Sequence, residues 1–314
     1  MIYHILRSQQ YSREDLERLF WDTDEIRRLY ENSLGKKDLR TRLEGKSMFA
    51  VFYEPSTRTR FSFCIAAANL GMTAIWTENA GEFSSAVKGE TLADTIRALG
   101  ELGGDVIVLR HPDVGAAEQA AAIVRKFGYN TAIINAGDGT GQHPTQALLD
   151  LYTVKRELGR LDNMTVVVGG DLANGRTVHS LVYLLSKFDD INFIFLSPPK
   201  LTMSKGILDH LQEHGIKFTE TQDKEWALRQ ADLIYWTRIQ TERGSTNATL
   251  DLTIGEPELR LIKPNARILH PLPRVSEIKT VVDEDPRAAY FRQISNGMFI
   301  RMALLEKACG GFLE

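Results

Sequence analysis

The sequence predicts an α/β protein made of two doubly wound domains, each a mainly parallel sheet flanked by helices. Short apolar runs alternate with helix-like stretches over most of the 314 residues. Near-continuous apolar strands separated by helices indicate parallel sheets that are covered on both faces. The chain is too long for one ordinary core, so two domains of roughly 150 residues each are expected.

The predicted strands fall into two groups along the chain. The first group is 47–53 (SMFAVFY), 105–110 (DVIVLR) and 131–135 (TAIIN). The second group is 164–169 (MTVVVG), 191–196 (INFIFL) and 232–236 (DLIYW). A helix pattern between Gln142 and Arg160 separates the groups, and we place the domain junction there. A last helix, about Asn296 to Lys307, is largely apolar and must be buried, but composition alone does not decide in which domain.

Composition excludes several function classes. The net charge of -3 and pI near 6.2 argue against a nucleic-acid or acidic-membrane surface, because those partners usually require a basic field. No stretch approaches the roughly 18 apolar residues of a membrane helix, and the N-terminus turns polar too early for a signal peptide. A cytoplasmic location is therefore expected. Cys64 and Cys309 predict neither a disulfide nor a zinc site, and no metal or organic cofactor is called for.

The first strand leads into an anion-binding motif. The strand ends at Tyr53 and is followed by Glu-Pro-Ser-Thr-Arg-Thr-Arg and a helix pattern. Ser56 is the expected N-cap, so free backbone N–H groups, the hydroxyls of Ser56, Thr57 and Thr59, and the Arg58 guanidinium could hold a phosphate. An ordinary capped helix with solvated arginines is the alternative. Two arginines flanking Thr59 oppose the helix dipole, which favours a bound anion.

This Ser-Thr-Arg-Thr-Arg segment resembles the carbamoyl-phosphate signature of the aspartate and ornithine carbamoyltransferase family. The resemblance extends from about Phe52 to the end of the chain. It implies that Ser56, Thr57, Arg58 and Thr59 hold the phosphate of carbamoyl phosphate. We expect residues 1–143 and 296–314 to form the carbamoyl-phosphate-binding domain, with the C-terminal helix returning to it, and residues 144–295 to form the aspartate-binding domain.

Two further segments match the carbamoyl-phosphate half of the family pattern. Arg110 follows a predicted strand, and the resemblance implies that it reaches carbamoyl phosphate, although a lone strand-end arginine is more often a surface residue. His143 opens the junction helix, with Pro144 at the first helical position. The helix dipole favours its neutral form, which suits polarisation of a carbonyl. By resemblance, His143 binds the carbamoyl oxygen and Gln146 binds the carbamoyl amide; a structural cap is the alternative.

The segment 81–90 is polar, bounded by glycines and reads as a loop. In the family, the matching loop carries a serine and a lysine, here Ser84 and Lys88, into the active site of a neighbouring subunit, where they bind carbamoyl phosphate. The resemblance thus implies a homotrimer with shared active sites. A solvated lysine is the alternative. The family often has a second basic residue where this chain has Val87, which alters the electrostatics of the loop without removing Lys88.

The segment VVVGGDLANGRTVHS is a strand, a turn and a helix that could be mistaken for a dinucleotide-binding motif. Its glycines do not give G-x-G-x-x-G, and Asp171 would repel a pyrophosphate. The segment presents Arg176 near the start of the helix, while Arg238 and Gln240 follow the strand 232–236. Two arginines at strand ends can each grip a carboxylate. The resemblance implies that Arg176, Arg238 and Gln240, together with Lys88, bind the acceptor aspartate; structural ion pairs are the alternative.

The segment His-Pro-Leu-Pro-Arg at 270–274 distinguishes the two branches of the family. Aspartate enzymes carry H-P-L-P, whereas ornithine enzymes typically carry H-C-L-P, and position 271 here is proline. The family implies a cis bond before Pro273, which would aim the carbonyls of Pro271 and Leu272 at the carbamoyl NH2. Ornithine or another amine is the alternative acceptor, but it would favour an acidic residue opposite its side chain.

The resemblance therefore implies transfer of the carbamoyl group of carbamoyl phosphate to the amine of L-aspartate, a reaction of pyrimidine biosynthesis. The expected catalytic residues are Arg58, Thr59, Lys88, Arg110 and His143. An inactive scaffold or metabolite-binding subunit would be expected to have lost at least one of these, and all are present. A separate regulatory chain is a possible partner. The conformation of residues 240–262 is not predicted.

Overall fold

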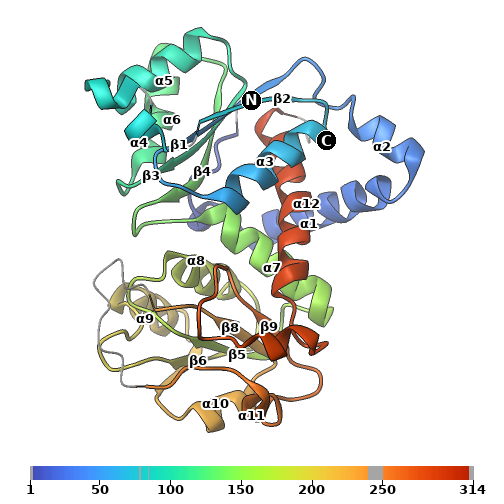
Figure 1. Cartoon of the computed structure of the whole chain (residues 1–314), viewed down its shortest axis with the longest axis vertical. Helices are drawn as coiled ribbons and strands as arrows, with labels where there is room; N and C mark the ends of the chain where they lie inside the picture. Colours follow the sequence, from blue (N-terminus) through green and yellow to red (C-terminus); the bar gives the residue numbers. More distant parts are fainter. Residues whose placement is uncertain (1–2, 78, 84, 240–249, 311–314) are drawn as a thin grey trace. The chain divides into compact units, whose positions relative to one another are not determined.

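The structure is a computed structural model, and it describes residues 3–77, 79–83, 85–239 and 250–310. The chain divides into two compact units (Figure 1), which are unit 1, Met1–Thr145 with Ser295–Glu314, and unit 2, Gln146–Ile294. Each unit contains one parallel sheet flanked by helices. The predicted fold class is confirmed, including the return of the C-terminal helix to the first unit. The ligand expected for each domain stays a prediction.

The sheet of unit 1 has the order β2-β1-β3-β4 and pairs in parallel throughout. Its strands are β1 Ser47–Phe52, β2 Thr73–Thr77, β3 Val106–His111 and β4 Ala132–Asp138. Its helices are η1 Ser8–Gln10, α1 Arg13–Tyr30, α2 Ser33–Leu39, α3 Thr57–Asn69, α4 Ala80–Phe83, η2 Ser85–Lys88, α5 Leu92–Glu101 and α6 Ala116–Phe127. The chain moves outward from β1 to β2 and then crosses back to β3. Because the chain reverses its direction across the sheet here, a topological switch point lies between the neighbouring strands β1 and β3. Ligands bind at such a point beyond the carboxyl ends of the strands.

Alternate residues of these strands face opposite helical layers. Phe49, Val51 and Ile107 belong to a buried cluster with the alanines of α6 and with Ile96 of α5. Figure 1 shows α5 and α6 on one side of this sheet and α3 on the other. The layers exclude water from both faces, which explains why the predicted strands are near-continuous apolar runs.

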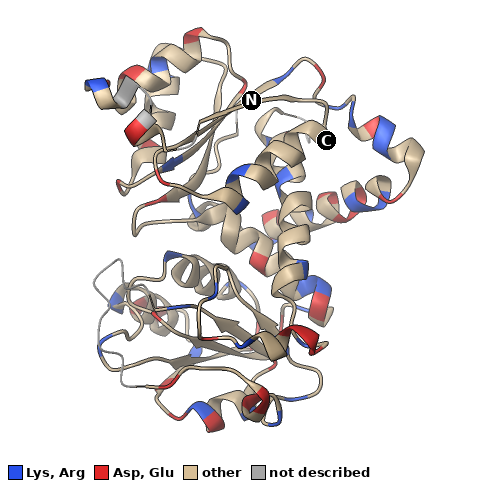
Figure 2. Cartoon of the chain, viewed as in Figure 1, with Lys and Arg blue, Asp and Glu red and all other residues tan. Residues whose placement is uncertain are grey.

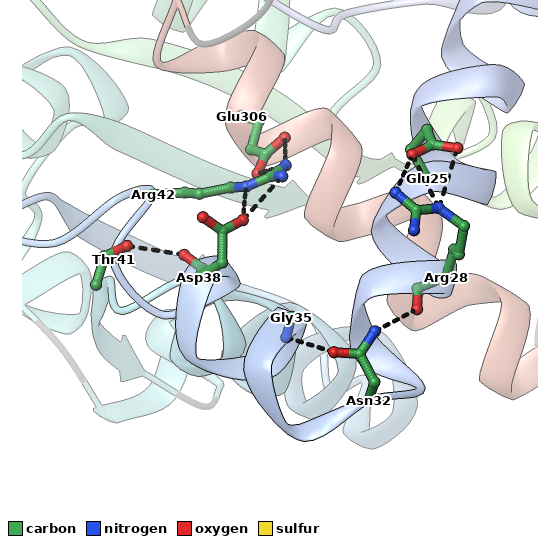
Figure 3. A network of polar contacts seen from close by, with 8 residues as sticks. All are labelled: Glu25, Arg28, Asn32, Gly35, Asp38, Thr41, Arg42 and Glu306. Atoms are coloured by element: carbon green, nitrogen blue, oxygen red, sulfur yellow. Dashed lines mark hydrogen bonds and ion pairs between the residues drawn. The ribbon is translucent and has the colours of Figure 1, made fainter.

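The N-terminal helices are joined to the C-terminal helix α12 (Tyr290–Ala308) by charged side chains. Arg42 donates to Asp38 at 3.2 Å and to Glu306 of α12 at 3.2 Å (Figure 3). Glu306 is 3% exposed. Burial raises the pKa of its carboxyl to about 7, although Arg42 opposes this shift. Elsewhere on α1, basic and acidic residues are interspersed (Figure 2), as in the pair of Arg13 with Glu17.

The sheet of unit 2 has the order β7-β6-β5-β8-β9 and is again parallel. Its strands are β5 Met164–Gly169, β6 Ile191–Leu196, β7 Lys217–Thr221, β8 Leu233–Trp236 and β9 Arg267–Leu269. Its helices are α7 Pro144–Leu158, α8 Arg176–Leu185, α9 Lys205–Glu213, α10 Lys224–Gln230, α11 Glu256–Leu259 and η4 Thr280–Glu284, with the first turn of α12. Figure 1 shows α8 and α9 on one side of this sheet and α10 and α11 on the other. The switch point lies between β5 and β8.

Two glycines allow β8 to lie close against the end of β5. A Cβ added to Gly169 would meet the ring of Trp236 at 2.3 Å. Gly170 has φ +126°, and a Cβ there would meet the backbone oxygen of Thr237 at 2.2 Å. The Gly-Gly pair is therefore explained by close packing at the switch point. This supports the interpretation that the segment is not a dinucleotide-binding motif.

The structure also differs from the sequence expectations. Strands β2, β7 and β9 were not predicted, and the segment 81–90, predicted as a loop, contains the short helices α4 and η2. The last helix begins at Tyr290, earlier than expected. Within the described residues, no helix is long and apolar enough to cross a membrane.

Candidate active site

The motif that was predicted to bind a phosphate follows the carboxyl end of β1. Ser56 occupies the N-cap position of α3, and its side chain makes no capping hydrogen bond within the described residues. Thr57 is exposed, and Thr59 is buried in the first turn. The helix N-terminus presents backbone N–H groups and a partial positive charge to any anion placed there.

The two arginines of this turn have different surroundings. Arg60 is 3% exposed, and its guanidinium lies over the rings of Trp76 at 4.5 Å and Phe61 at 4.9 Å. Arg58 is exposed. Partial desolvation lowers the pKa of Arg58, which nevertheless stays far above physiological pH and keeps its charge. Arg58 is therefore the first-turn arginine placed to bind an anion, whereas Arg60 packs α3 against β2.

Arg110 lies on the other side of the same switch point. The strand register pairs it with Phe52, the last residue of β1. Its guanidinium forms an ion pair with Glu54 at 3.2 Å and donates to the carbonyl of Ala136 in β4 at 3.2 Å. These contacts hold Arg110 between the segment that enters α3 and the neighbouring strand.

His143 follows β4, the next strand along this sheet edge, and is 4% exposed. The segment before it is fixed by Asp138, whose carboxylate accepts from Gln142 N at 2.5 Å and from Gly115 N at 2.9 Å. Pro144 is the first residue of α7, as predicted. The structure thus brings the Ser56–Thr59 motif, Arg110 and His143 to the carboxyl ends of β1, β3 and β4.

The segment predicted to reach a neighbouring subunit is described only in part. Lys88 is the last residue of η2 and is exposed. Ser84 lies outside the described residues, as does Gln240 of the predicted acceptor site.

The two arginines of the predicted acceptor site flank the switch point of unit 2. Arg176 is the first residue of α8 and is 7% exposed. Arg238 follows β8 and is half-buried. The turn before Arg176 is held by Asp171, which is fully buried and accepts from Asn174 N at 3.0 Å. Guanidinium groups so placed can bind carboxylates in bidentate fashion.

The 270–274 segment follows β9 and contains a cis peptide bond between Leu272 and Pro273, which confirms the bond that the resemblance implied. His270 fixes this segment, because its Nδ1 accepts from Leu272 N at 2.8 Å and its Nε2 then donates to Glu277 at 2.9 Å. Although burial opposes the shift, the hydrogen bond from His270 and backbone N–H groups lower the pKa of Glu277. Pro271 and Leu272 are both half-buried.

Gln146 lies in the first turn of α7, and its Nε2 donates to Asp150 at 2.8 Å. The sequence patterns did not indicate Asp150, although its spacing of four residues from Gln146 places both on one helix face. They also gave no indication that Tyr235, His270, Glu277 and Gln293 support the candidate site. No sequence signal indicated those contacts, because most join segments far apart in the chain.

The described part of the chain offers little support for a metal site or for a nucleophilic cysteine. It contains no group of three or more His, Cys, Asp or Glu residues that could hold a metal ion. Cys64 and Cys309 are free and partly buried. Burial raises the pKa of both thiols, that of Cys309 to about 11, so neither is a ready nucleophile at neutral pH.

In comparisons with known proteins, both halves of the chain match family models. Residues 3–156 match the model described as aspartate/ornithine carbamoyltransferase, carbamoyl-P binding domain, and residues 162–307 match the Asp/Orn binding domain of the same family.

Individual relatives are similar over nearly the whole chain. Aspartate carbamoyltransferase 1, chloroplastic, from Pisum sativum is 47% identical over 96% of this chain and 77% of its own length. The aspartate carbamoyltransferase catalytic subunit of Aliivibrio fischeri (strain MJ11) is 41% identical over 96% of this chain and 95% of its own. A crystal structure of aspartate transcarbamoylase from Trypanosoma cruzi with N-(phosphonacetyl)-L-aspartic acid is 40% identical, with a TM-score of 0.88 and coverage of 96% and 94%.

Proposed function

The chain belongs to the aspartate/ornithine carbamoyltransferase family, and we propose that it transfers the carbamoyl group of carbamoyl phosphate to the amine of L-aspartate, giving N-carbamoyl-L-aspartate and phosphate. This reaction belongs to pyrimidine biosynthesis. The observation that carries the proposal is the placement of arginines at the switch points of both sheets, Arg58 and Arg110 in unit 1 and Arg176 and Arg238 in unit 2.

The phosphate of carbamoyl phosphate binds at the N-terminus of α3. Backbone N–H groups and the hydroxyls of Ser56, Thr57 and Thr59 donate to its oxygens, and Arg58 neutralises its charge. Each charge-assisted hydrogen bond contributes roughly 1.5 to 3 kcal/mol. Phosphate is the leaving group, so Arg58, together with Lys88, also stabilises the charge that grows on it during transfer.

The carbamoyl group is polarised by donors on its oxygen. His143, Arg110 and Thr59 donate to this oxygen, which becomes an oxyanion in the tetrahedral intermediate. Donors that are fixed before the reaction stabilise this charge without reorganising. The carbamoyl NH2 instead requires acceptors, which Gln146 and the carbonyls of Pro271 and Leu272 supply.

The acceptor L-aspartate is held by its two carboxylates. Arg176, Arg238 and Gln240 bind them, with Lys88 as an additional cation. The deprotonated amine attacks the carbamoyl carbon, the tetrahedral intermediate collapses, and the bond to phosphate breaks. No covalent enzyme intermediate is required, so orientation of the two substrates is a main source of rate enhancement.

The choice of acceptor is tested by measuring phosphate release from carbamoyl phosphate with L-aspartate or with L-ornithine. The proposal predicts release that depends on aspartate and no release above background with ornithine. Release with ornithine alone would move the chain to the other branch of the family. The absence of release with either acceptor, from folded protein, would favour a metabolite-binding subunit.

The proposed assembly is a homotrimer in which Lys88 serves the active site of the adjacent copy. An apolar face of unit 1 supports it. Phe61 and Ile65 of α3 are 50% and 53% exposed, and Trp76 of the edge strand β2 is 50% exposed, with its ring and that of Phe61 both against the Arg60 guanidinium. Exposed apolar side chains that gather in this way mark protein interfaces. A second copy of the chain covers this face in the proposed trimer.

Mixing inactive variants tests the shared site. At a carbamoyl phosphate concentration below the wild-type KM, Arg58→Ala chains and Lys88→Ala chains are each expected to be nearly inactive, because each trimer lacks one cation in every site. Mixed trimers contain some sites in which both residues are intact, so part of the activity should return. Mixed trimers, identified by a mass tag on one variant, that remain inactive would contradict the sharing of Lys88.

The proposal also includes a location in the cell. We place the protein in the cytoplasm, although the names of the plant relatives place those proteins in the chloroplast.

The proposal also includes a separate regulatory chain as a possible partner. The name of the Aliivibrio fischeri relative, catalytic subunit, is in keeping with such a chain.

A further inference from the structure

A buried carboxylate in unit 2 collects hydrogen bonds from three different elements. Asp150 of α7 is 0% exposed. It accepts from Gln146 Nε2 at 2.8 Å, from Gln293 Nε2 of α12 at 2.5 Å, and from the Tyr235 hydroxyl of β8 at 2.6 Å. All four residues belong to unit 2. A buried charged group requires such compensation, because desolvation is otherwise costly.

The three contacts define the chemical state of Asp150. Two of its partners are amide NH2 groups, which can only donate, so an ionised and acceptor-only carboxylate satisfies both. The third partner remains protonated, since burial and the neighbouring Asp150 raise the pKa of Tyr235 well above its ordinary value. Asp150 is therefore a fixed acceptor at the centre of the network.

A fixed acceptor decides which way a glutamine amide points. The oxygen and nitrogen of a glutamine amide have nearly the same shape, and their hydrogen-bond partners decide the orientation. Asp150 can accept only from Nε2 of Gln146, so Oε1 occupies the other end of the amide. The carbamoyl NH2 of the substrate offers only donors near its nitrogen, and Oε1 is the end of Gln146 that can accept from it.

The same carboxylate orients the second set of acceptors. Gln293 donates its Nε2 to Asp150, and its Oε1 accepts from the backbone N–H of His270 at 3.2 Å. His270 is the first residue of the H-P-L-P segment, and its ring fixes Leu272 N. Asp150 thus connects Gln146 to the segment whose Pro271 and Leu272 carbonyls are the other proposed acceptors.

We propose that Asp150 is a positioning residue that orients the acceptors for the carbamoyl NH2 and thereby gives selectivity for carbamoyl phosphate over acyl phosphates that lack this group. Acetyl phosphate, in which a methyl group replaces the NH2, is the matched ligand. The proposal rests on the role of Gln146 in the proposed function. A site built to bond a substrate N–H discriminates strongly against an analogue without it, because its buried acceptor is then unpaired.

Asp150→Asn tests the proposal with little change of shape. Where the asparagine oxygen takes the place of the Oδ2 that accepts from Tyr235, its NH2 takes the place of the Oδ1 that accepts from Gln146 and Gln293. This NH2 then donates to Gln146 Oε1, which turns Gln146 Nε2 toward the carbamoyl NH2 and places donor against donor. We expect kcat/KM for carbamoyl phosphate to fall about 10- to 100-fold. The inhibition constant of acetyl phosphate, measured as a competitor of carbamoyl phosphate, should change less than about 3-fold because this ligand makes no such bond.

Two controls separate positioning from general structural damage. Asp22→Asn neutralises another buried carboxylate, which pairs with Arg18 in unit 1, and it should leave both constants near the wild-type values. Gln293→Met removes the link from Asp150 to His270 and should also weaken carbamoyl phosphate selectively. If Asp150→Asn does not fold, the Gln293→Met variant supplies the test.

The outcomes distinguish this proposal from the proposed function. Equal weakening of carbamoyl phosphate and acetyl phosphate binding, or no change in either, in both Asp150→Asn and Gln293→Met would overturn the positioning role. Gln146→Ala should match the selective loss, and adding Asp150→Asn to it should cost little more. Wild-type protein without carbamoyl transfer would refute the function itself. An active wild type with an unaffected Gln146→Ala variant would refute the assigned role of Gln146 and with it this inference.

Discussion

The candidate sites of the two units are built in different ways. In unit 1, the proposed phosphate-binding groups from Ser56 to Thr59 are contiguous in the sequence and are positioned by one strand–helix junction. In unit 2, Arg176, Arg238 and the 270–274 segment come from distant parts of the chain. Hydrogen bonds such as that from Gln293 to Asp150, 143 residues apart, hold parts of this unit together. A local motif can bind an anion almost by itself, whereas a site made of separate segments depends on a buried support.

This difference separates two classes of substitution. In unit 1, the residues that contact the ligand should dominate the losses of activity. In unit 2, residues that never touch the ligand, such as Asp150 or Gly169, should also matter because they hold the contacting groups in place.

The largest loss of activity is expected for His143→Ala. Its contact with the carbamoyl oxygen strengthens as the oxyanion forms, so kcat should fall about 100- to 1000-fold. The KM for carbamoyl phosphate should rise much less, because the phosphate contacts remain. Steady-state kinetics measure both constants, and a near-normal kcat would remove His143 from this role.

The next largest effects should separate the two units by substrate. Arg58→Ala should raise the KM for carbamoyl phosphate, and Arg176→Ala should raise the KM for aspartate, each by roughly 10- to 100-fold for one charge-assisted contact. Each variant serves as the control of the other in the same assay. If Arg58→Ala instead raised only the KM for aspartate, the assignment of the two sites would be reversed.

A smaller effect, on stability, is expected at the switch point of unit 2. Gly169→Ala forces a Cβ into the Trp236 ring, and the overpacking should cost about 1 to 3 kcal/mol of unfolding free energy. The matched change Gly206→Ala, in helix α9 with nothing within 4 Å of the added Cβ, should be neutral or stabilising. Urea denaturation compares the two, and equal effects would contradict the close packing of β8 against β5.

The smallest effect is a pH dependence in unit 1. The folded-state pKa of Glu306, about 7, lies above the ordinary glutamate value of 4.5, so its stabilisation is complete below pH 4.5 and is lost as pH rises through about 7. Arg42, Asp22 and Asp38 are the charged groups that act on it. From pH 6 to pH 8, the unfolding free energy of the wild type should fall by about 1 to 2 kcal/mol relative to Glu306→Gln. A difference between the two proteins that stays constant with pH would refute the raised pKa.

The strands that the sequence predicted and those it missed differ in burial. The core strands β1, β3, β5 and β6 are almost completely buried and appear as continuous apolar runs. The edge strands β2 and β7 are largely exposed, and β9 has three residues. A strand that is largely exposed to solvent needs few apolar residues, so its sequence shows only a weak apolar pattern. Whether it forms depends on pairing with strands that are distant in the sequence.

For the candidate site too, only features encoded by neighbouring residues could be predicted from the sequence. The Ser56–Thr59 motif and Pro144 at the start of α7 were predictable because neighbouring residues carry the signal. Asp150 was visible as a residue one turn after Gln146, but its contacts with Tyr235 and Gln293 arise only when β8 and α12 pack against α7. Long-range contacts of this kind leave no local pattern.

A crystal structure of this protein with N-(phosphonacetyl)-L-aspartate, the ligand in the solved Trypanosoma cruzi structure, would test the assignment of the two sites most directly. This compound carries a phosphonate and two carboxylates in one molecule. We predict that the phosphonate lies at the N-terminus of α3 against Arg58, and that the carboxylates bind Arg176 and Arg238. A phosphonate away from α3, or carboxylates that touch neither arginine, would contradict the account.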